Sequence, residues 1–457
     1  MPPSLPPGCL LVPDLAVAMA RGSAHLGLPA PADLDAALAL VLAVARELPG
    51  SGPDPRYLGP LDQLLEPFVA DLDDETLDAR LARFWQTAAR IDGTPHADLG
   101  PDDGRAVRAL LRVDRRLRLP APTLALRVDP RRTPDGLLRD AVRTACADGK
   151  PQWVNHPMAV ADHGERHAVL GCVATLPLGG GALAAVPLDL AAAVRAATSA
   201  DGVDRTVDRA VDRAVDRAVA ALAPLAREAL ARLEDHWLVR EGLIGTGRFT
   251  AVVGVHGVAE AVQELPVRDG VRAPDGGPAR YGPDPAASDR AADLLARVSA
   301  RVAATPVPGC TATGGHAVVQ AWAAPPGGTA GGAVPEASRP TLYRHLRALV
   351  PAQRHLLGGV ADTVTVEPVV EHNPDAVVAV LRGAFAEGVR ELTVDVAGNG
   401  FSRVTGYLKR DRDVAALRAA AAEQVAAILR AAPQDRAAVR AALQEGKPVR
   451  AGEPGRG

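Results

Sequence analysis

Residues 400–411 read GFSRVTGYLKRD. Most residues in this stretch favour an extended, half-buried strand, because β-branched and aromatic side chains fit a pleated surface. Gly406 interrupts the pattern between Thr405 and Tyr407. Glycine weakens the interior of a strand, so its presence here indicates a need for a residue without a side chain.

A second unusual stretch, VLGCVATLPLGGGA, covers residues 169–182. Cys172 ends an apolar run, and Gly179, Gly180 and Gly181 form a turn that bends the chain or lets a ligand approach the backbone. Taken alone, a single buried cysteine is more often structural than reactive, and a glycine triplet is more often a turn than a phosphate site. The Lys-Ser/Thr ending of a Walker loop is missing.

Together, Gly406 and Cys172 suggest radical chemistry. The α-carbon of glycine can become planar and share an unpaired electron with the flanking amide groups, because no side chain obstructs it. A cysteine thiol is a natural partner, since its S–H bond is comparable in strength with many substrate C–H bonds. A thiyl radical can therefore take a hydrogen atom from a substrate and later return it.

At this point the sequence resembles the glycyl radical enzymes. Their C-terminal signature is an Arg, a small apolar residue, a variable residue, Gly and an aromatic residue, and it is met by Arg403-Val404-Thr405-Gly406-Tyr407. Cys172 meets the mid-chain cysteine loop. More narrowly, the sequence is similar to the YjjI-type branch over residues 57–410, in the segments YLGPLDQLLEPF, PHADLGPDD, NHPM, GCVATLPLGGGA, VGVHGVAEAV, HNPDAVVAVLRGAF and DVAGNGFSRVTGYL.

The resemblance implies a ten-stranded α/β barrel with surrounding helices, in which Cys172 and Gly406 occupy two loops that meet at the centre. Residues 1–385 would form the barrel, with a helical repeat insertion at about 201–235. Residues 386–457 would form the C-terminal glycyl radical region with terminal helices. The family also implies a homodimer and a separate activating enzyme that uses S-adenosylmethionine and an iron-sulfur cluster to remove the α-hydrogen of Gly406.

Differences from better-defined branches of the glycyl radical enzymes narrow the range of reactions that the sequence supports. No second cysteine stands beside Cys172, as in a formate lyase, and Ala174 occupies the position where eliminases and decarboxylases usually have Glu. The C-terminal tail lacks the cysteine pairs of anaerobic ribonucleotide reductases. The reaction and substrate are therefore not predicted. An alternative function is a catalytically inactive barrel that binds a small metabolite at Gly179–Gly181.

Composition excludes several other classes. The 457-residue chain is 47% apolar and carries a formal net charge of -3, which indicates neither a nucleic-acid nor a strongly charged partner. The longest apolar run, 36–45, is too short to span a bilayer, and no basic segment precedes the first apolar residues. We therefore expect a cytoplasmic protein. The 4 cysteines are far apart, so neither a bound metal nor a disulfide framework is predicted.

Alternating helix and strand patterns predict an α/β architecture with a mostly parallel sheet. Helices are expected over 34–47, 75–91, 105–119 and 137–147, and strands over 123–128, 152–154, 167–177, 250–255 and 391–396. The tetrapeptide repeat VDRTVDRAVDRAVDRAV at 203–219 predicts a long, solvated helix with Arg and Asp paired along its surface.

Two polar residues stand where a barrel loop would face a pocket. Asn155 and His156 follow a predicted strand, which makes them candidate substrate contacts, although helix capping or core hydrogen bonding also explains them. His96, in the segment PHADLGPDD, is predicted to lie in a turn.

Overall fold

The computed structural model describes residues 5–6, 8–49, 55–170, 174–198, 203–265, 279–322, 331, 333–335, 340–360, 362–404 and 407–430. The chain divides into two compact units. The larger contains Met1–Asn399 and, from the following segment, Tyr407. The smaller contains Gly400–Val404 and continues from Leu408.

A six-stranded sheet has the order β11-β12-β5-β4-β3-β2. Strands β2 to β5 are parallel to one another, β12 is antiparallel to β5, and β11 is parallel to β12. The strands are β2 (Pro55–Pro60), β3 (Thr94–Leu99), β4 (Thr123–Val128), β5 (Gln152–Asn155), β11 (Thr363–Val366) and β12 (Glu391–Val396).

A four-stranded sheet has the order β1-β8-β9-β10, with β1 antiparallel to β8 and the others parallel. These strands are β1 (Leu10–Val12), β8 (Gly180–Asp189), β9 (Phe249–His256) and β10 (Val318–Ala321). Gly358 donates its N–H to Val319 O, and Ala321 donates to Gly359 O, so the chain just before β11 lies beside β10. The predicted α/β fold is confirmed, and the ten strands of these two sheets are consistent with the expected barrel.

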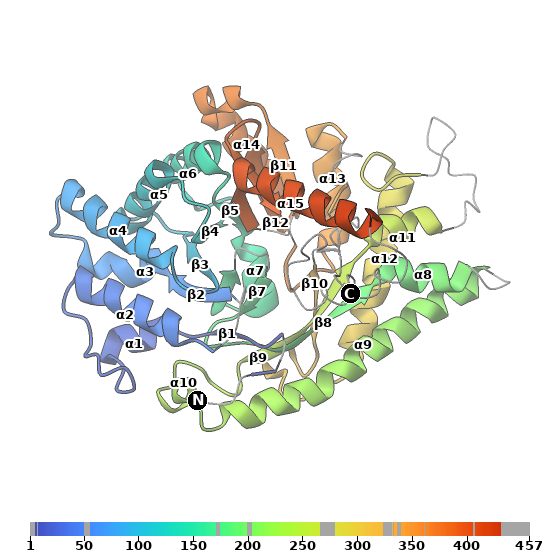
Figure 1. Cartoon of the computed structure of the whole chain (residues 1–457), viewed down its shortest axis with the longest axis horizontal. Helices are drawn as coiled ribbons and strands as arrows, with labels where there is room; N and C mark the ends of the chain where they lie inside the picture. Colours follow the sequence, from blue (N-terminus) through green and yellow to red (C-terminus); the bar gives the residue numbers. More distant parts are fainter. Residues whose placement is uncertain are drawn as a thin grey trace, which may run out of the picture. The chain divides into compact units, whose positions relative to one another are not determined.

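Helices of the larger unit follow most strands, as the sequence pattern predicts. On the side of β2 to β5 (Figure 1) they are α1 (Leu15–Arg21), α2 (Leu34–Glu47), α3 (Leu61–Leu65), η1 (Glu66–Phe68), α4 (Asp74–Ala88), α5 (Arg105–Leu117), α6 (Asp135–Asp148) and α7 (His156–His163). Later in the chain come α8 (Leu190–Thr198), α9 (Val203–Leu233), α10 (Trp237–Arg240), α11 (Val258–Glu264), α12 (Pro285–Ala303), η2 (Thr311–Thr313), α13 (Leu342–Gln353), η4 (Pro368–His372) and α14 (Pro374–Ala386).

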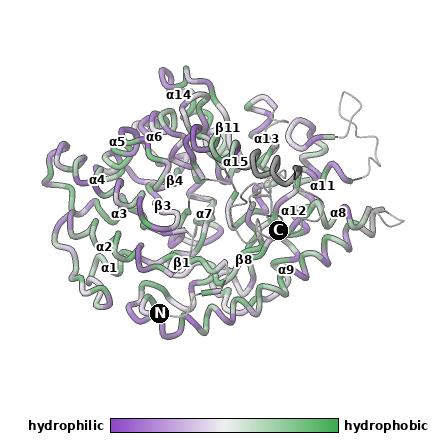
Figure 2. Tube along the Cα trace, viewed as in Figure 1, coloured by the Kyte–Doolittle hydropathy of each residue, from purple (hydrophilic) through white to green (hydrophobic). Residues whose placement is uncertain are grey.

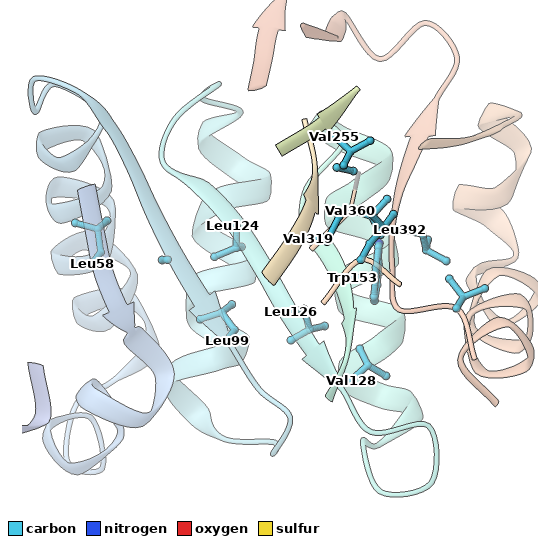
Figure 3. Packing of buried hydrophobic residues seen from close by; sticks show 14 of the residues in the cluster. Leu58, Leu99, Leu124, Leu126, Val128, Trp153, Val255, Val319, Val360 and Leu392 are labelled. Atoms are coloured by element: carbon cyan, nitrogen blue, oxygen red, sulfur yellow. The ribbon is translucent and has the colours of Figure 1, made fainter. Parts of the chain in front are cut away.

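The two faces of the strands carry different side chains. On β4, Leu124, Leu126 and Val128 pack into the main hydrophobic core, while Ala125 and Arg127 lie on the other face. Figure 3 shows these three apolar residues lying with others of the core, among them Trp153 of β5. The face of β4 that carries Ala125 and Arg127 therefore lies outside the main core and is available to form a site.

The repeat helix α9 is more buried than the sequence interpretation supposed. Its valines Val207, Val211, Val215 and Val219 are buried in the core, and hydrophobic and hydrophilic residues alternate along it (Figure 2). Its aspartates form ion pairs with another helix: Asp212 and Asp216 bind Arg297 and Arg301 of α12. The period of four thus serves packing on one face and pairing with α12 beside it.

The smaller unit contains β13 (Phe401–Val404), part of β14 (Tyr407–Arg410) and α15 (Asp411–Arg430). The Ser402 hydroxyl donates to the Asp411 carboxylate at 2.7 Å, and the Asp411 N–H donates to Gly400 O at 3.1 Å, so the start of α15 is bonded to the β13 region. Among all described residues of the chain, no helix has the length and apolar character needed to span a membrane.

Candidate active site

The cysteine segment belongs to a β-hairpin. β6 (His167–Leu170) and β7 (Ala174–Pro177) pair antiparallel in a two-stranded sheet, and their last partners before the turn are Leu170 and Ala174. The prediction of one strand over 167–177 is therefore wrong, because the chain reverses between these partners. Cys172 lies in the interval 171–173, outside the described residues.

The hairpin packs against strands of both larger sheets. One face, formed by Ala168, Leu170, Ala174 and Leu176, lies in a small core with residues from five strands: Val12, Tyr57, Ala182, Val252 and Val318. The other face includes Val169, which clusters with Ala125 of β4, Val154 of β5 and Ala159 of α7. The two described strands of the hairpin are thus packed on both faces against strands of the larger sheets.

Asp98 of β3 connects the hairpin to the six-stranded sheet. Its fully buried carboxylate accepts hydrogen bonds from the Tyr57 hydroxyl at 2.9 Å and from the Val169 N–H at 3.2 Å. The Arg127 guanidinium lies 3.9 Å from the same carboxylate. Burial raises the pKa of Asp98, and Arg127 opposes that shift. Sequence reasoning missed the roles of Asp98, Tyr57 and Arg127, because each is a polar residue within a strand.

His96, two residues before Asp98, lies beside the glycine signature. Its ring centroid is 6.0 Å from that of Tyr407, and its Nδ1 is hydrogen-bonded to the Thr123 hydroxyl. Burial lowers the pKa of His96 to about 3, so the ring is neutral at physiological pH. The prediction that His96 lies in a turn is wrong: it is a fully buried residue of β3.

The other signature residues are described only in part. Arg403 and Val404 end β13, and the Arg403 side chain is half-buried. Thr405 and Gly406 lie outside the described residues. The strand β3 therefore contacts both the cysteine hairpin, through Asp98, and the residue that follows Gly406, through His96.

Glu391 of β12 holds the other strand of the hairpin. It is fully buried and accepts hydrogen bonds from the Thr175 hydroxyl at 2.8 Å, the Val360 N–H at 3.1 Å and the Gln152 amide at 3.3 Å. Burial raises the pKa of Glu391, and the bond from Thr175 opposes the shift. Glu391 is a second buried carboxylate that sequence reasoning missed.

The two polar substrate-contact candidates occupy neighbouring positions with different surroundings. Asn155 donates from its side-chain amide to Phe385 O at 3.0 Å and Val389 O at 2.9 Å, so it connects β5 to the end of α14 and to the segment before β12. His156 begins α7, and its ring lies 5.5 Å from that of His167. Burial lowers the pKa of His156. A substrate contact for either residue stays a prediction.

The glycine triplet has a packing explanation. A Cβ atom at Gly180 would lie 1.7 Å from Arg248 O, and one at Gly181 would lie 2.0 Å from Leu10 O. Gly179 has φ of 76°, a conformation that glycine adopts without strain. These residues let β8 pass closely between β1 and the start of β9, and a ligand contact there stays a prediction.

No group of three or more His, Cys, Asp or Glu side chains that could hold a metal ion occurs within the residues that the structure describes. The buried carboxylates of Asp98 and Glu391 accept hydrogen bonds from groups of the protein itself.

Solved structures with similar folds belong largely to one class of enzyme. They include a glycyl radical enzyme from Archaeoglobus fulgidus, with a TM-score of 0.66 and 14% identity over 84% of this chain and 66% of that one. Hydroxyproline dehydratase from Clostridioides difficile gives a TM-score of 0.64 and 13% identity, covering 78% of this chain and 62% of that one. An anaerobic ribonucleotide reductase gives 0.68 and 12%, with coverages of 89% and 77%.

These likenesses define the fold as that of the glycyl radical enzymes. This chain spans only 66% and 62% of the length of the first two enzymes, and their activities are not carried over to it.

The chain belongs to the YjjI-like glycyl radical enzyme family, whose model, described as "Glycyl radical enzyme YjjI-like", matches residues 8–441. It is 34% identical over 414 residues to the uncharacterized protein YjjI of Escherichia coli K12, covering 90% of this chain and 79% of YjjI. An uncharacterized protein of Haemophilus influenzae is 27% identical over 412 residues, with coverages of 88% and 79%.

Proposed function

We propose that Gly406 stores a backbone radical and that Cys172 uses it to take a hydrogen atom from a small organic substrate. The observation that carries this proposal is the double contact of β3: Asp98 bonds to the cysteine hairpin, and His96 lies beside Tyr407. Asp98 and His96 are two positions apart on one strand and share a face, about 7 Å apart along it. Two segments far apart in sequence are thus held near one another.

The chemistry begins when the Gly406 radical takes the thiol hydrogen of Cys172, which leaves an intact glycine and a thiyl radical. The thiyl then takes hydrogen from a substrate carbon, which restores the thiol and leaves a substrate radical. The buried surroundings of the hairpin favour this sequence, because radicals must be kept from water and oxygen. Asn155, His156 and Gly179–Gly181 are the proposed substrate contacts, and Arg403, Val404, Thr405 and Tyr407 support the radical glycine.

Partners follow from the same proposal. Glycyl radical enzymes in general need a radical-SAM activase, and we propose that such an enzyme, with its S-adenosylmethionine and iron-sulfur cluster, removes the α-hydrogen of Gly406. No metal is required in this chain. We also propose that the protein is a cytoplasmic homodimer that works under anaerobic conditions.

Electron spin resonance tests the proposal. After anaerobic activation by a radical-SAM activase, the wild type should give the doublet of a glycine α-radical, and Gly406→Ala should give none. Cys172→Ala should keep the doublet but lose the conversion of any metabolite that the activated wild type consumes. A wild type that consumes a metabolite equally well without the doublet would contradict the proposal.

Exposure to air gives an independent readout. Oxygen adds to a glycine radical and cuts the backbone there, so mass spectrometry should find a C-terminal fragment that begins near residue 406. A wild type that stays intact and radical-free after treatment with activases that load other enzymes would favour the inactive, metabolite-binding alternative.

A further inference from the structure

We propose that Asp98 and Glu391 are positioning residues that hold the two strands of the Cys172 hairpin from its two edges. This inference rests on the proposed function. It concerns residues that act through the hairpin, because their described contacts are with the protein itself.

The backbone pattern of the hairpin shows why it needs such partners. Val169 and Thr175 are opposite one another in the register, and both donate their N–H groups away from the hairpin. Val169 donates to Asp98, and Thr175 donates to Gly358 O at 3.0 Å. In an antiparallel pair such outward N–H groups need a neighbouring strand, and a buried one left unmet costs about 1–3 kcal/mol. Here a carboxylate and a carbonyl take the place of a neighbouring strand.

Each carboxylate is fixed by further groups of the six-stranded sheet or of the chain beside it. Asp98 is held by the Tyr57 hydroxyl of β2 and lies 3.9 Å from Arg127 of β4. Glu391 is held by Gln152 of β5 and by the Val360 N–H. An acceptor that already has two partners cannot rotate freely, so it defines the position of a third group that binds it. The hairpin is thus bonded to β3 on one edge and to β12 on the other.

The location of these bonds matters for the cysteine. The pair Val169 and Thr175 is separated from the interval 171–173 by one further register pair, Leu170 and Ala174. A hydrogen atom passes between two centres only when they are almost in contact, and a displacement of about 1 Å can cost about 100-fold in rate. Loosening either bond should therefore slow hydrogen transfer without removing the store of radical at Gly406.

Solvent deuterium offers a readout that needs no substrate. In D₂O the Cys172 thiol becomes S–D, and the Gly406 radical takes this deuterium to give a Cα carrying one H and one D, while sulfur becomes a thiyl. The thiyl then removes either atom and regenerates the glycine radical. When it removes H, the radical carries D, and the resonance doublet collapses toward a single line. The rate of collapse measures how well sulfur reaches the glycine.

Thr175 gives the most selective variants. Thr175→Val removes the hydroxyl bond to Glu391 with little change in volume, and Thr175→Ser keeps it. We expect Thr175→Val to activate to the wild-type radical yield but to exchange about 10- to 100-fold more slowly. Thr175→Ser should exchange at nearly the wild-type rate. Thr144→Val is the matched control, because the Thr144 hydroxyl is bonded to Leu111 O and Asp140 O in helices away from the hairpin.

Tyr57→Phe tests the other edge of the hairpin. It also keeps the inference testable if Thr175→Val fails to fold. It removes only the hydroxyl that holds Asp98, and its exchange should slow by a smaller factor, about 3- to 10-fold. Exchange at the wild-type rate in both Thr175→Val and Tyr57→Phe would overturn this inference but leave the proposed function intact. A wild type that forms no radical would overturn the proposed function, and a wild-type radical without exchange would overturn both.

Discussion

The two larger sheets treat the cysteine hairpin differently. The four-stranded sheet offers it apolar side chains, Ala182, Val252 and Val318, which pack against Leu176 and its neighbours. The six-stranded sheet offers hydrogen-bonding carboxylates, Asp98 and Glu391. Apolar contact is not directional, whereas a hydrogen bond is. The comparison suggests that both sheets bury the hairpin, through residues such as Val252 on one side and Ala125 on the other, and that the six-stranded sheet also fixes its position by directional bonds.

The largest effect should come from removing a carboxylate of the six-stranded sheet. Asp98→Ala removes the carboxylate that lies 3.9 Å from the buried Arg127 guanidinium and leaves Tyr57 and Val169 without this acceptor. We expect a loss of about 3–5 kcal/mol in the free energy of unfolding, measured by urea denaturation. Asp102→Ala is the control, since its pair with Arg132 is largely exposed and should contribute under about 1 kcal/mol. Equal losses in the two variants would contradict this division of roles.

An effect of similar or smaller size should follow on the apolar side. Leu176→Ala opens a cavity between the hairpin and the four-stranded sheet and should cost about 2–4 kcal/mol in the free energy of unfolding. Leu417→Ala, at a helix position that is 60% exposed, should change stability by under about 0.5 kcal/mol. We expect the rate of deuterium exchange to fall less in Leu176→Ala than in Thr175→Val. The reverse order would contradict the proposed difference between the two sheets.

The last predicted effect concerns the pH dependence of stability. Burial raises the pKa of Asp62, which lies beside β3 and accepts the Gly100 N–H, to about 7. Its unfolded pKa is about 3.9, so the folded state holds the proton more tightly. The contribution to stability is full below about pH 4 and is lost as pH rises through 7, at up to about 1.4 kcal/mol per pH unit.

Asp62→Asn resembles the protonated form and removes this titration. In urea denaturation between pH 4.5 and 7.5, the variant should gain stability relative to the wild type as pH rises. Asp148, whose pKa burial also raises to about 7, is present in both proteins, so it does not affect the difference. A difference that stays constant over this range would contradict the prediction.

Much of the helical layer and several strands could be predicted from the sequence. The predicted bounds of α2, β4 and β12 agree with the structure, because each has a regular pattern of apolar residues that matches a helix or a strand. The strand β3 was not predicted, since Pro95, His96 and Asp98 have low strand propensity. Its place between β2 and β4, which supply both sets of ladder partners, overrides that propensity.

The site was predictable only in part for the same reason. The motifs around Cys172 and Gly406 identify the family, but polar residues inside strands carry no sign of their partners. Asp98 meets Val169 and Glu391 meets Thr175 across 71 and 216 positions. Only the folded sheets bring these residues together, so no local pattern could have indicated the two bonds.

The pairing of β1 with β8 has a consequence for biosynthesis. Leu10 is synthesised well before its partner Ala182, because all of β2 to β7 lie between them in the chain. Until then the N-terminal strand has an open edge, a state that favours contact with other chains. The glycines of β8 allow it to pair closely with β1, and this pairing closes the edge. Until β8 has been synthesised, the nascent polypeptide needs protection from aggregation, by a chaperone or by fast folding.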